Sequence, residues 1–551
     1  MPKKKMLIYP YVTPRFDPDK WVLHAILQAR AEQMPDRPFL QWTDASEPLS
    51  FREVDKLTNR IANGLANRGV KKGDLVALFL PNCIEYIFLW ISLSKLGAVE
   101  VTIGEPFSGN FLRHPISLSG AEMIVTSNSL SHRLAEVEQG LPKLKHAIIW
   151  DDPEAYEVET SVFERIEASS YDDLVDASDA RPVVAVRPRD LAAVLFTSGT
   201  TGPSKGVLMP QSQIYFFAEQ MCSMMNMTED DVYMTAFPFF HANAQILSIY
   251  ASLIGGIRCV LYRKFSGSLW IERIRRSGAT LTNCLGSTLG YIAAQPRSPD
   301  DKEHNLRCMQ ILPSTYAIQN LFKERFGVPH SIEGFGQTEI SMPFLTPYGW
   351  PRPEGAVGLL VDQWFEVQLV DPKTGRVVDV GETGELLVRH KFPGIICDGF
   401  LGMPEATIAA WRDLWFHTGD AMKRDEDGWY YFVDRLKDTL RRGGENISSF
   451  EIEEAVQIHP AIEECAIVAA PSTIEGGEDE VKLCVVLKPG ASFSESDFIE
   501  WCRPKIPSFA IPRYIEILEA LPKTPSAKIR KSELRKRGVN DQTWDRLALS
   551  E

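Results

Sequence analysis

The feature that most constrains the fold of this chain is an apolar run that leads directly into a glycine-rich loop. Residues 191–196 read Leu-Ala-Ala-Val-Leu-Phe, a short unbroken apolar segment that favours a buried strand. Residues 197–206 then supply three glycines, five hydroxyl side chains and one lysine. Glycine lets backbone N–H groups turn toward a ligand and hydroxyl groups add donors, so the loop suits phosphate oxygens. The sequence therefore predicts a phosphate-binding loop at the end of a central strand.

Two common phosphate-binding patterns are absent from this loop. A Walker loop requires Gly-Lys followed by Ser or Thr, whereas here Ser204 precedes Lys205 and Gly206 follows it. The Gly-x-Gly-x-x-Gly pattern of dinucleotide-binding folds does not occur here either. On this stretch alone, an ordinary glycine-rich connection without a ligand stays open as the alternative.

Length and composition indicate a globular protein of several domains. At 551 residues the chain exceeds what one hydrophobic core organises, so at least two domains are expected. Its 44% apolar and 24% charged residues are typical of globular proteins. The formal net charge of −14 argues against binding to nucleic acid or to an anionic membrane.

The cysteines and the apolar segments predict a soluble, cytoplasmic protein. The nine cysteines are scattered and form no Cys-x-x-Cys pair, which is typical of reduced thiols rather than of disulfides or a zinc site. The N-terminus carries three lysines but only a short apolar run broken by Pro10 and Pro14, unlike a secretion signal. The most apolar window, residues 75–93, contains a proline, an asparagine and a glutamate and is expected not to span a bilayer.

The first hundred residues predict a strand–helix–strand unit. Residues 50–53 form a Ser-x-x-Glu capping box that is expected to open a helix. Residues 74–80 are predicted as a buried strand, 81–96 as a helix and 99–103 as the next strand. This succession favours a parallel sheet with helical crossovers. The acidic segment 151–185 is expected to be an irregular surface excursion.

Four further segments carry side chains suited to chemistry. They are Phe237-Pro-Phe-Phe-His-Ala-Asn-Ala-Gln245, Glu333-Gly-Phe-Gly-Gln-Thr-Glu339, Trp415-Phe-His-Thr-Gly-Asp420 and Lys523-Thr-Pro-Ser-Ala-Lys528. Taken singly, a histidine among aromatic residues is typical of a packed core. An Asp-Arg pair such as Asp434-Arg435 is, by itself, typical of a salt-bridged surface. The interpretation of each segment therefore depends on the others.

Together with the loop at 197–206, these segments resemble, in content and order, the motifs of the adenylate-forming superfamily. This superfamily includes acyl-CoA ligases, peptide-synthetase adenylation domains and luciferases, which join a carboxylate to AMP and usually pass the acyl group to a thiol. The Phe-His-x-Asn-Ala-Gln form at 240–245 is most similar to the carnitine and crotonobetaine CoA-ligase branch. The resemblance covers the chain from about residue 20 to residue 537.

The resemblance implies a set of nucleotide contacts in the N-terminal part of the chain. The phosphate-binding loop would use Thr197, Ser198, Gly199, Thr200, Thr201, Gly202 and Lys205. Phe335 and Gly336 would contact adenine, Thr338 the α-phosphate, and Glu339 a Mg²⁺ ion that bridges the phosphates. Asp420 would accept hydrogen bonds from both ribose hydroxyls, and Arg435 would be the second ribose contact. His241 would gate the acyl pocket.

The resemblance also implies three positions in a small C-terminal domain. Lys437 would be the hinge about which that domain rotates. Gly444 would let the pantetheine of CoA pass close to the backbone, which a side chain with a Cβ would prevent. Lys528 would bridge the acyl carboxylate and the α-phosphate during adenylation.

The implied fold is a multi-domain α/β protein. Residues 1–436 would form a large N-terminal domain with two α/β sheet subdomains and a smaller β-rich one. Residues 437–551 would form a small, mobile α+β domain, with helices at 450–458 and 494–505 and strands at 463–469 and 481–487. The oligomeric state is not fixed by the sequence, and a homodimer is one option.

The implied activity is that of an ATP-dependent acyl-CoA ligase with ATP, Mg²⁺, CoA and a small carboxylic acid as its ligands. Two departures from the family pattern leave alternatives open. Residues 310–315, Gln-Ile-Leu-Pro-Ser-Thr, are bulkier than the Gly-Ala-Pro run that lies against adenine, and Ala527 replaces a glycine before the last lysine. A thioester-forming enzyme that uses a preformed acyl-adenylate, and a scaffold without catalysis, therefore remain alternatives. The acid is not identified, although small residues (Ala242, Gly286, Ser287, Gly334) suggest room for a broad one.

Overall fold

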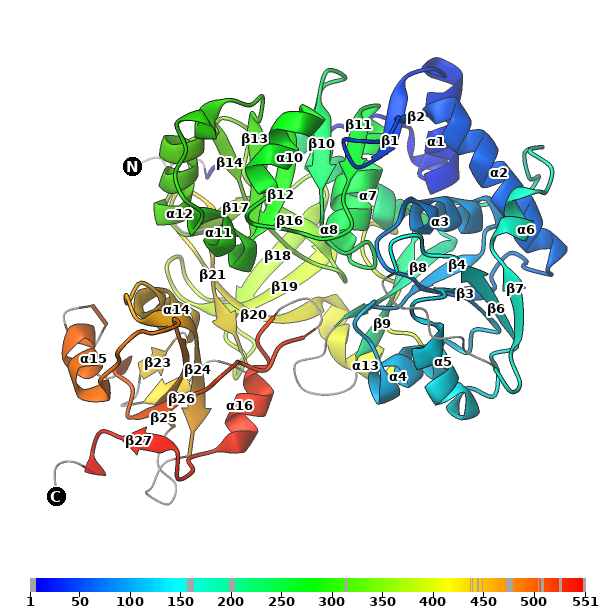
Figure 1. Cartoon of the computed structure of the whole chain (residues 1–551). Coiled ribbons are helices and arrows are strands. Elements are labelled where there is room, and N and C mark those ends of the chain that lie inside the picture. Colours follow the sequence, from blue (N-terminus) through cyan, green and yellow to red (C-terminus); the bar gives the residue numbers. More distant parts are fainter. Residues whose placement is uncertain are drawn as a thin grey trace.

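The computed structural model describes most of the chain. The described residues are 6–155, 163–197, 204–312, 316–436, 438, 440–442, 445–447, 449–471, 479–503, 505–506, 510–524 and 528–548. They form three sheets of seven strands, followed by a smaller domain at the C-terminal end (Figure 1). The predicted multi-domain α/β fold, with a large N-terminal part and a smaller C-terminal domain, is confirmed.

The first sheet carries the predicted strand–helix–strand unit and the glycine-rich loop. Its strand order is β7-β6-β5-β3-β4-β8-β9. The strands are β3 Leu75–Phe79, β4 Val99–Thr102, β5 Met123–Ser127, β6 His146–Trp150, β7 Glu167–Ser170, β8 Leu191–Thr197 and β9 Lys205–Pro210. Neighbours are parallel except for β8 and β9, which form an antiparallel hairpin. Its helices are α2 Phe51–Asn67, α3 Ile84–Leu96, α4 Gly109–Ser119, α5 Ser131–Val137 and α6 Asp172–Val175, with the short η2 Glu138–Gly140.

The local predictions for this sheet hold with two corrections. The capping box is present, because the Ser50 side chain accepts from the Glu53 N–H and the Glu53 side chain accepts from the Ser50 N–H. Helix α3 begins at Ile84 rather than at Pro81, because Cys83 has an extended backbone and is the N-cap. Segment 151–185 is not wholly irregular, because β7 adds a parallel edge strand to β6 and α6 follows it.

The second sheet is also mostly parallel. Its order is β14-β13-β12-β10-β11-β1-β2, and only β1 and β2 are antiparallel among the described strands. The strands are β1 Pro38–Trp42, β2 Leu49–Ser50, β10 Val232–Thr235, β11 Arg258–Leu261, β12 Leu281–Leu285, β13 Cys308–Leu312 and β14 His330–Ile332. The helices are η1 Pro18–Lys20, α1 Leu23–Gln33, α7 Gln211–Met224, α8 Ala242–Ala244, η3 Gln245–Tyr250, α9 Ala251–Gly255, α10 Trp270–Ser277, α11 Gly286–Ala293, η4 Pro299–Lys302, α12 Tyr316–Leu321 and η5 Phe322–Phe326.

The third sheet is antiparallel and is the predicted β-rich subdomain. Its order is β15-β16-β17-β21-β20-β19-β18. The strands are β15 Gly334–Gln337, β16 Ser341–Leu345, β17 Ala356–Leu360, β18 Phe365–Val370, β19 Gly384–His390, β20 Phe416–Arg424 and β21 Trp429–Arg435, with α13 Pro404–Ala410 and η6 Arg412–Leu414 between β19 and β20. A continuous apolar core with Trp21, Tyr215 and Trp364 joins it to the helices of the other sheets.

The C-terminal domain has its own apolar core and a mixed four-stranded sheet. The strands of that sheet are β24 Ile462–Ala470, β25 Glu480–Leu487, β26 Tyr514–Ile517 and β27 Thr543–Asp545, and β22 Leu440–Arg442 pairs with β23 Glu445–Ile447 in a separate two-stranded sheet. The helices are α14 Ser449–Gln457, α15 Glu495–Cys502 and α16 Lys531–Arg537. The predicted helices and strands of this α+β domain are present, with ends that differ by at most three residues. Figure 1 shows it as a separate lobe, in orange and red, beside β20 and β21.

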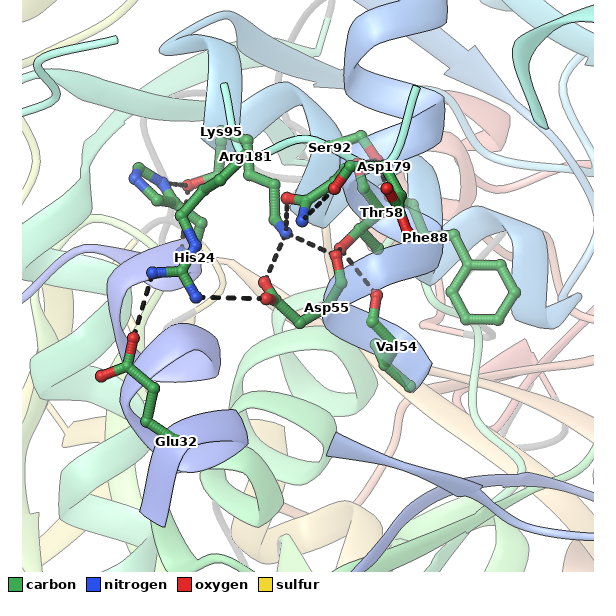
Figure 2. Close-up of polar contacts among 12 residues, drawn as sticks. His24, Glu32, Val54, Asp55, Thr58, Phe88, Ser92, Lys95, Asp179 and Arg181 are labelled. Atoms are coloured by element: carbon green, nitrogen blue, oxygen red, sulfur yellow. Dashed lines mark hydrogen bonds and ion pairs between the residues drawn. The ribbon is translucent and has the colours of Figure 1, made fainter. Parts of the chain in front are cut away.

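A buried polar cluster fastens the helices of the N-terminal region to one another (Figure 2). Lys95, near the end of α3, is 1% exposed and donates to Asp55 Oδ1 at 2.6 Å and to Asn59 Oδ1 at 2.6 Å. Arg181 bridges Asp55 and Glu32 of α1, with N–O distances of 3.5 and 3.0 Å. Burial lowers the pKa of Lys95 to about 8, and the Asp55 carboxylate opposes that shift. Its contacts join α1, α2 and α3, so the cluster is structural.

Candidate active site

The glycine-rich segment lies in the sequence between the antiparallel strands β8 and β9. Thr197, the last residue of β8, lies opposite Lys205, the first residue of β9, and its hydroxyl donates to the Lys205 carbonyl at 3.5 Å. The predicted contacts Ser198, Gly199, Thr200, Thr201 and Gly202 lie outside the described residues. The hairpin therefore holds Thr197 and Lys205 at the two ends of the loop.

Two neighbours fix the β9 end of this loop. The Nε2 atom of His114, on α4, lies 2.9 Å from the Ser204 carbonyl. At Gly206 a Cβ atom would approach Val194 Cγ1 to 2.7 Å, so the hairpin requires glycine beside Lys205. The Lys205 ammonium lies 4.8 Å from the ring centroid of Phe400, which contributes a cation–π contact. The lysine is therefore held next to the third sheet.

The motif at 333–339 forms β15 and the turn into β16. Phe335 is half-buried, and its ring centroid lies 6.1 Å from that of Phe344 and 6.0 Å from that of Phe432. At Gly336 a Cβ atom would lie only 2.1 Å from the Ser341 carbonyl oxygen. Packing of this tight turn is thus a reason for Gly336 that is independent of any ligand.

The turn that carries Thr338 and Glu339 is anchored from two sides. Gln213 of α7 donates its side-chain amide to the Thr338 carbonyl at 2.9 Å and to the Glu339 carbonyl at 3.3 Å. The Cys397 N–H donates to the same Glu339 carbonyl at 2.8 Å. Burial raises the pKa of the Glu339 carboxyl, and the positive charges of Arg435 and Lys205 oppose that rise. Glu339 therefore lies among cations from two different motifs.

Asp420 is the fully buried carboxylate of the site. It lies on β20 directly opposite Arg435 on β21, and the Arg435 Nε atom is 2.8 Å from Asp420 Oδ1. Gln337 donates its side-chain amide to Asp420 Oδ2 at 2.6 Å and to the Thr418 carbonyl at 3.2 Å. Both carboxylate oxygens are thus oriented by neighbours, and a carboxylate has further lone pairs with which to accept. Gln337 was not singled out from the sequence, although it lies within the Gly-Gln-Thr-Glu motif.

Lys528 of the C-terminal domain reaches this same cluster. A short turn holds its backbone, since the Thr524 N–H donates to the Lys528 carbonyl at 2.7 Å and the Lys528 N–H donates to the Thr524 hydroxyl at 3.1 Å. The Lys528 side chain keeps contact with solvent. Its pKa is lowered by the surrounding protein and by Arg435, while Glu339 and Asp420 oppose the shift. The structure therefore brings together Lys528, Glu339, Asp420 and Arg435.

His241, which follows β10 of the second sheet, lies within electrostatic range of Lys528. It is the N-cap of α8, and its ring centroid lies 4.3 Å from that of Phe240. Burial, and then the charge of Lys528, lowers the pKa of His241 to about 4, so the imidazole is neutral at pH 7. Its Nε2 atom is buried and has no hydrogen-bond partner within the part of the chain that the structure describes. An uncharged ring with an unused nitrogen thus borders the cluster.

Contacts beside the predicted hinge connect the two domains. Asp434 Oδ2 accepts from both the N–H and the hydroxyl of Ser449, the first residue of α14, each at 2.7 Å. Phe432 contacts Phe450 edge to face with centroids 5.9 Å apart. The predicted positions Lys437 and Gly444 lie outside the described residues, as do residues 313–315 of the stretch expected to lie against adenine.

The charges of the site fit a phosphorylated ligand together with a divalent cation. Lys205, Arg435 and Lys528 offer positive charge to phosphate oxygens, and Glu339 offers one carboxylate. Mg²⁺ in nucleotide sites takes one or two carboxylates and completes its shell with phosphates and water. In the described ranges no group of three or more His, Cys, Asp or Glu side chains is arranged as a metal site. The donor set thus fits Mg²⁺ that arrives with a nucleotide better than a resident metal.

The fold matches that of adenylate-forming enzymes of known structure. An anthranilate CoA ligase solved with anthranoyl-AMP aligns with a TM-score of 0.83 at 23% identity, covering 95% of this chain and 98% of that chain. ATP-bound MatB from Rhodopseudomonas palustris aligns with a TM-score of 0.82 at 23% identity, covering 94% and 99%. The fold of this chain is thus the one that this class of enzymes has.

Sequence comparison places the chain within a family of that class. The signature of the AMP-binding enzyme family matches residues 27–394, and that of the AMP-binding enzyme C-terminal domain matches residues 451–528. The crotonobetaine/carnitine–CoA ligases of Salmonella typhimurium and Salmonella typhi are each 32% identical to it over 496 residues, covering 88% of this chain and 93% of theirs. The chain belongs to the AMP-binding enzyme family, and the resemblance to the adenylate-forming superfamily is confirmed.

Proposed function

We propose that this protein is an acid–CoA ligase that activates a carboxylic acid as its acyl-adenylate and transfers the acyl group to CoA. The observation that carries the proposal is the convergence of Lys528, from the C-terminal domain, on Glu339, Asp420 and Arg435 of the N-terminal domain. The relatives named as crotonobetaine/carnitine–CoA ligases support the same reaction class.

In the first step, the acid's carboxylate oxygen attacks the α-phosphorus of ATP, and the bond to the β-phosphate breaks to release pyrophosphate. Lys528 would stabilise the negative charge shared by the carboxylate and the α-phosphate. Thr338 would donate to the α-phosphate, and residues 198–202 with Thr197 and Lys205 would bind the outer phosphates. Glu339 would hold Mg²⁺, whose charge offsets that of the phosphates when it is bound.

The nucleoside would lie along the third sheet. Asp420 would accept from the two ribose hydroxyls, with Arg435 and Gln337 holding its carboxylate in place. Phe335, with Gly336 beside it, would offer the adenine its half-exposed ring. His241 would border the acyl group, because a neutral imidazole tolerates an apolar or a polar neighbour without a charge to desolvate.

In the second step, the CoA thiolate attacks the acyl carbonyl, the thioester bond forms, and AMP leaves with the electron pair of the broken acyl–phosphate bond. We propose that the domain boundary lies at 436/437, that rotation about Lys437 withdraws Lys528, and that Gly444 then borders the pantetheine. Breaking the two Asp434–Ser449 hydrogen bonds is expected to accompany that rotation, because the residues lie on opposite sides of the hinge.

A thioester-forming enzyme that uses a preformed acyl-adenylate is the second candidate. The bulky stretch Gln310–Thr315 favours it, because displaced adenine would move the α-phosphorus away from the acid. A misplacement of about 1 Å can reduce such a step by on the order of 10²-fold. The presence of Lys528 in the cluster favours the complete two-step ligase.

We also propose a cytoplasmic location, supported by nine cysteines that are all buried free thiols. None of the described helices is long and apolar enough to cross a bilayer.

The experiment is to assay the two half-reactions separately. Pyrophosphate release is measured with ATP, Mg²⁺ and a panel of acids that includes carnitine-like and aryl acids, since relatives and neighbours carry those names. Thioester formation is measured with synthetic acyl-adenylate and CoA. Acid-dependent release followed by thioester formation supports the complete ligase. Thioester formation without pyrophosphate release supports the second candidate, provided that a variant with Gly-Ala-Pro at positions 311–313 does release pyrophosphate. Absence of both would contradict both candidates.

A further inference from the structure

The segment from Phe237 to Gln245, which follows β10 of the second sheet, is hydrogen-bonded to side chains that belong to the subdomain of the first sheet. This segment is called the His241 segment here. Asn82, which follows β3, donates its amide N–H to the Phe237 carbonyl at 2.9 Å and accepts from the Phe239 N–H at 2.9 Å. Because one amide satisfies two backbone groups, the start of the segment is fixed relative to the first sheet.

The end of the His241 segment is held by a carboxyl group inside the first sheet. Glu100 lies on β4 and is fully buried. Gln245, the last residue of the segment, lies with its side-chain Nε2 at 2.8 Å from both Glu100 oxygens. The Tyr86 hydroxyl donates to Glu100 Oε1 at 2.8 Å, and the Tyr86 ring contacts Phe239 edge to face. The Glu100 carboxyl thus connects the end of the segment to α3 and β4, while Asn82 holds its start.

A carboxyl group is a costly choice for this position. Burial of an ionised carboxylate away from a cation costs far more than burial of an amide or hydroxyl. Within the described residues Glu100 has hydrogen-bond donors as neighbours but no ion pair. Tyr86 and Gln245 both donate hydrogen bonds, and the Glu100 carboxyl accepts from both. The carboxyl therefore orients these two side chains, at a cost in stability.

The position of Glu100 links the two halves of the active site. Glu100 on β4 is paired in register with Ala193 on β8, the strand that ends at Thr197 and enters the glycine-rich loop. Gln245 is four residues from His241, which lies within electrostatic range of Lys528. A displacement of the His241 segment against β4 would therefore move the acyl side of the site relative to the phosphate side.

We propose that Glu100 is a positioning residue, assisted by Tyr86 and Asn82. It fixes the position of the His241 segment relative to β8, the strand that leads into the glycine-rich loop. This position in turn determines which acid is adenylated. The inference rests on the proposed function. Glu100 touches no reacting atom in this scheme; it acts through Gln245. Its loss is expected to change acid recognition more than nucleotide recognition, because the ribose and adenine positions belong to the third sheet.

The ionisation of Glu100 should make the KM for the acid depend on pH, which a purely structural residue would not do. Burial raises the pKa of Glu100 to about 7, and the hydrogen bonds from Tyr86 and Gln245 oppose that rise. Tyr86 of α3 is the titratable group in contact with it, and burial keeps the Tyr86 pKa well above its ordinary value. The ladder neighbours Val76 of β3 and Ala193 of β8 carry no charge. Above pH 7 the ionised carboxylate accepts both bonds most strongly, so the acid KM should fall as pH rises through 7.

The test is a reciprocal exchange of the pair, with pyrophosphate release as the assay. Glu100→Gln and Gln245→Glu are made singly and together, and acids of three lengths are compared. Each single change should raise the acid KM at least about tenfold and alter the preference among acids, with the ATP KM changed less than about twofold. The double change should recover most of the loss, because the introduced amide can donate to the introduced carboxylate. The inflection near pH 7 should be absent in Glu100→Gln.

The controls separate this role from a folding defect and from failure of the proposed function. Glu167→Gln alters an exposed carboxylate on β7 of the same sheet and should change none of these constants. If a single variant does not fold, Tyr86→Phe keeps the ring against Phe239 and should raise the acid KM by about threefold. Unchanged acid KM and acid preference in active, folded variants would overturn this inference alone. An unsubstituted protein that releases no pyrophosphate with any acid would overturn the proposed function and the inference together.

Discussion

At the residue scale, the candidate site consists of charged groups whose orientation is fixed by neighbours from other segments of the chain. Asp420 is held by Gln337 and Arg435, and the Glu339 turn is held by Gln213 of α7. These holders matter because a carboxylate that already has its direction set loses little rotational freedom when a ligand binds. The motifs thus supply the reactive groups, and residues distant in sequence supply their geometry.

Asp420→Ala is expected to weaken AMP binding at least about tenfold. In the proposed function the substitution would remove two charge-assisted hydrogen bonds to the ribose hydroxyls, each worth roughly 1.5–3 kcal/mol. Isothermal titration calorimetry with AMP is the measurement. Glu426→Ala, in the exposed turn after the same strand, is the matched control and should bind AMP normally. An unchanged Kd in Asp420→Ala would show that the ribose does not contact this residue.

His241 is expected to make the protein less stable in mild acid. Its folded-state pKa of about 4 lies below the unfolded value of about 6.5, so the unfolded chain binds the extra proton between these values. Stability should therefore fall as pH decreases from about 6.5 to 4, by about 1.4 kcal/mol for each pKa unit. Urea unfolding of His241→Phe should show a shallower decline over this window. Parallel curves for the two proteins would contradict the assignment.

At the element scale, the positions of turns and helix ends are determined by residues close in sequence. The contacts between elements are determined by residues that are far apart in sequence. The Ser50 capping box and the β8–β9 hairpin with glycine at 206 are consequences of residues close in sequence. The Lys95–Asp55 pair and the Asn82 clamp instead join elements that the chain order alone does not bring together. Hydrophobic periodicity in the sequence does not predict such pairs, because a charged residue on a helix is usually solvent-exposed.

Lys95→Met is expected to destabilise the N-terminal region by about 3 kcal/mol, because it removes the nearer cation and leaves the buried Asp55 carboxylate only partly compensated, by Arg181 at 3.5 Å. The double variant Lys95→Met with Asp55→Leu should recover much of that loss, since the uncompensated charge is then absent. Chemical unfolding of the four proteins of this cycle is the measurement. Lys145→Met, which removes an exposed ion pair with Glu122, is the control and should leave stability nearly unchanged, because solvent screens such a pair. Additive effects at 95 and 55 would contradict the interpretation.

At the whole-molecule scale, the site is complete only when the C-terminal domain lies against the N-terminal domain. Lys528, on one domain, lies among Glu339, Asp420 and Arg435 of the other. The same arrangement is stabilised at the hinge side by Asp434 and Ser449, and at the outer side by Arg530 over the Phe111 ring at 4.9 Å. The described arrangement therefore corresponds to the adenylation step of the proposed reaction.

Lys528→Ala and Gly444→Leu are expected to separate the two half-reactions. Lys528→Ala should abolish acid-dependent pyrophosphate release, a loss of at least about 10²-fold, and should still form thioester from synthetic acyl-adenylate and CoA. Gly444→Leu should do the reverse, because a side chain there would obstruct the pantetheine. Lys523→Ala, near Lys528 in sequence but paired with Glu464 of β24, is the control. Loss of both half-reactions in both variants would contradict domain rotation.

The sequence by itself determined the fold class and the family, through motifs that predict the reactive side chains. Strand and helix positions were predictable because apolar runs, capping residues and glycines act within a few residues. The start of α3 and the edge strand β7 were not, because the Pro81-Asn82 turn and the pairing of β7 with β6 depend on distant partners.

Only the tertiary structure decided which groups hold the site in place. Glu100 and Gln245 are 145 positions apart in the chain, and Gln213 and Thr338 are 125 apart. No local pattern marks such pairs, since a buried hydrogen bond needs only that two elements pack at the right distance. Local chemistry fixed what the reactive residues are, whereas packing between subdomains fixed where they point.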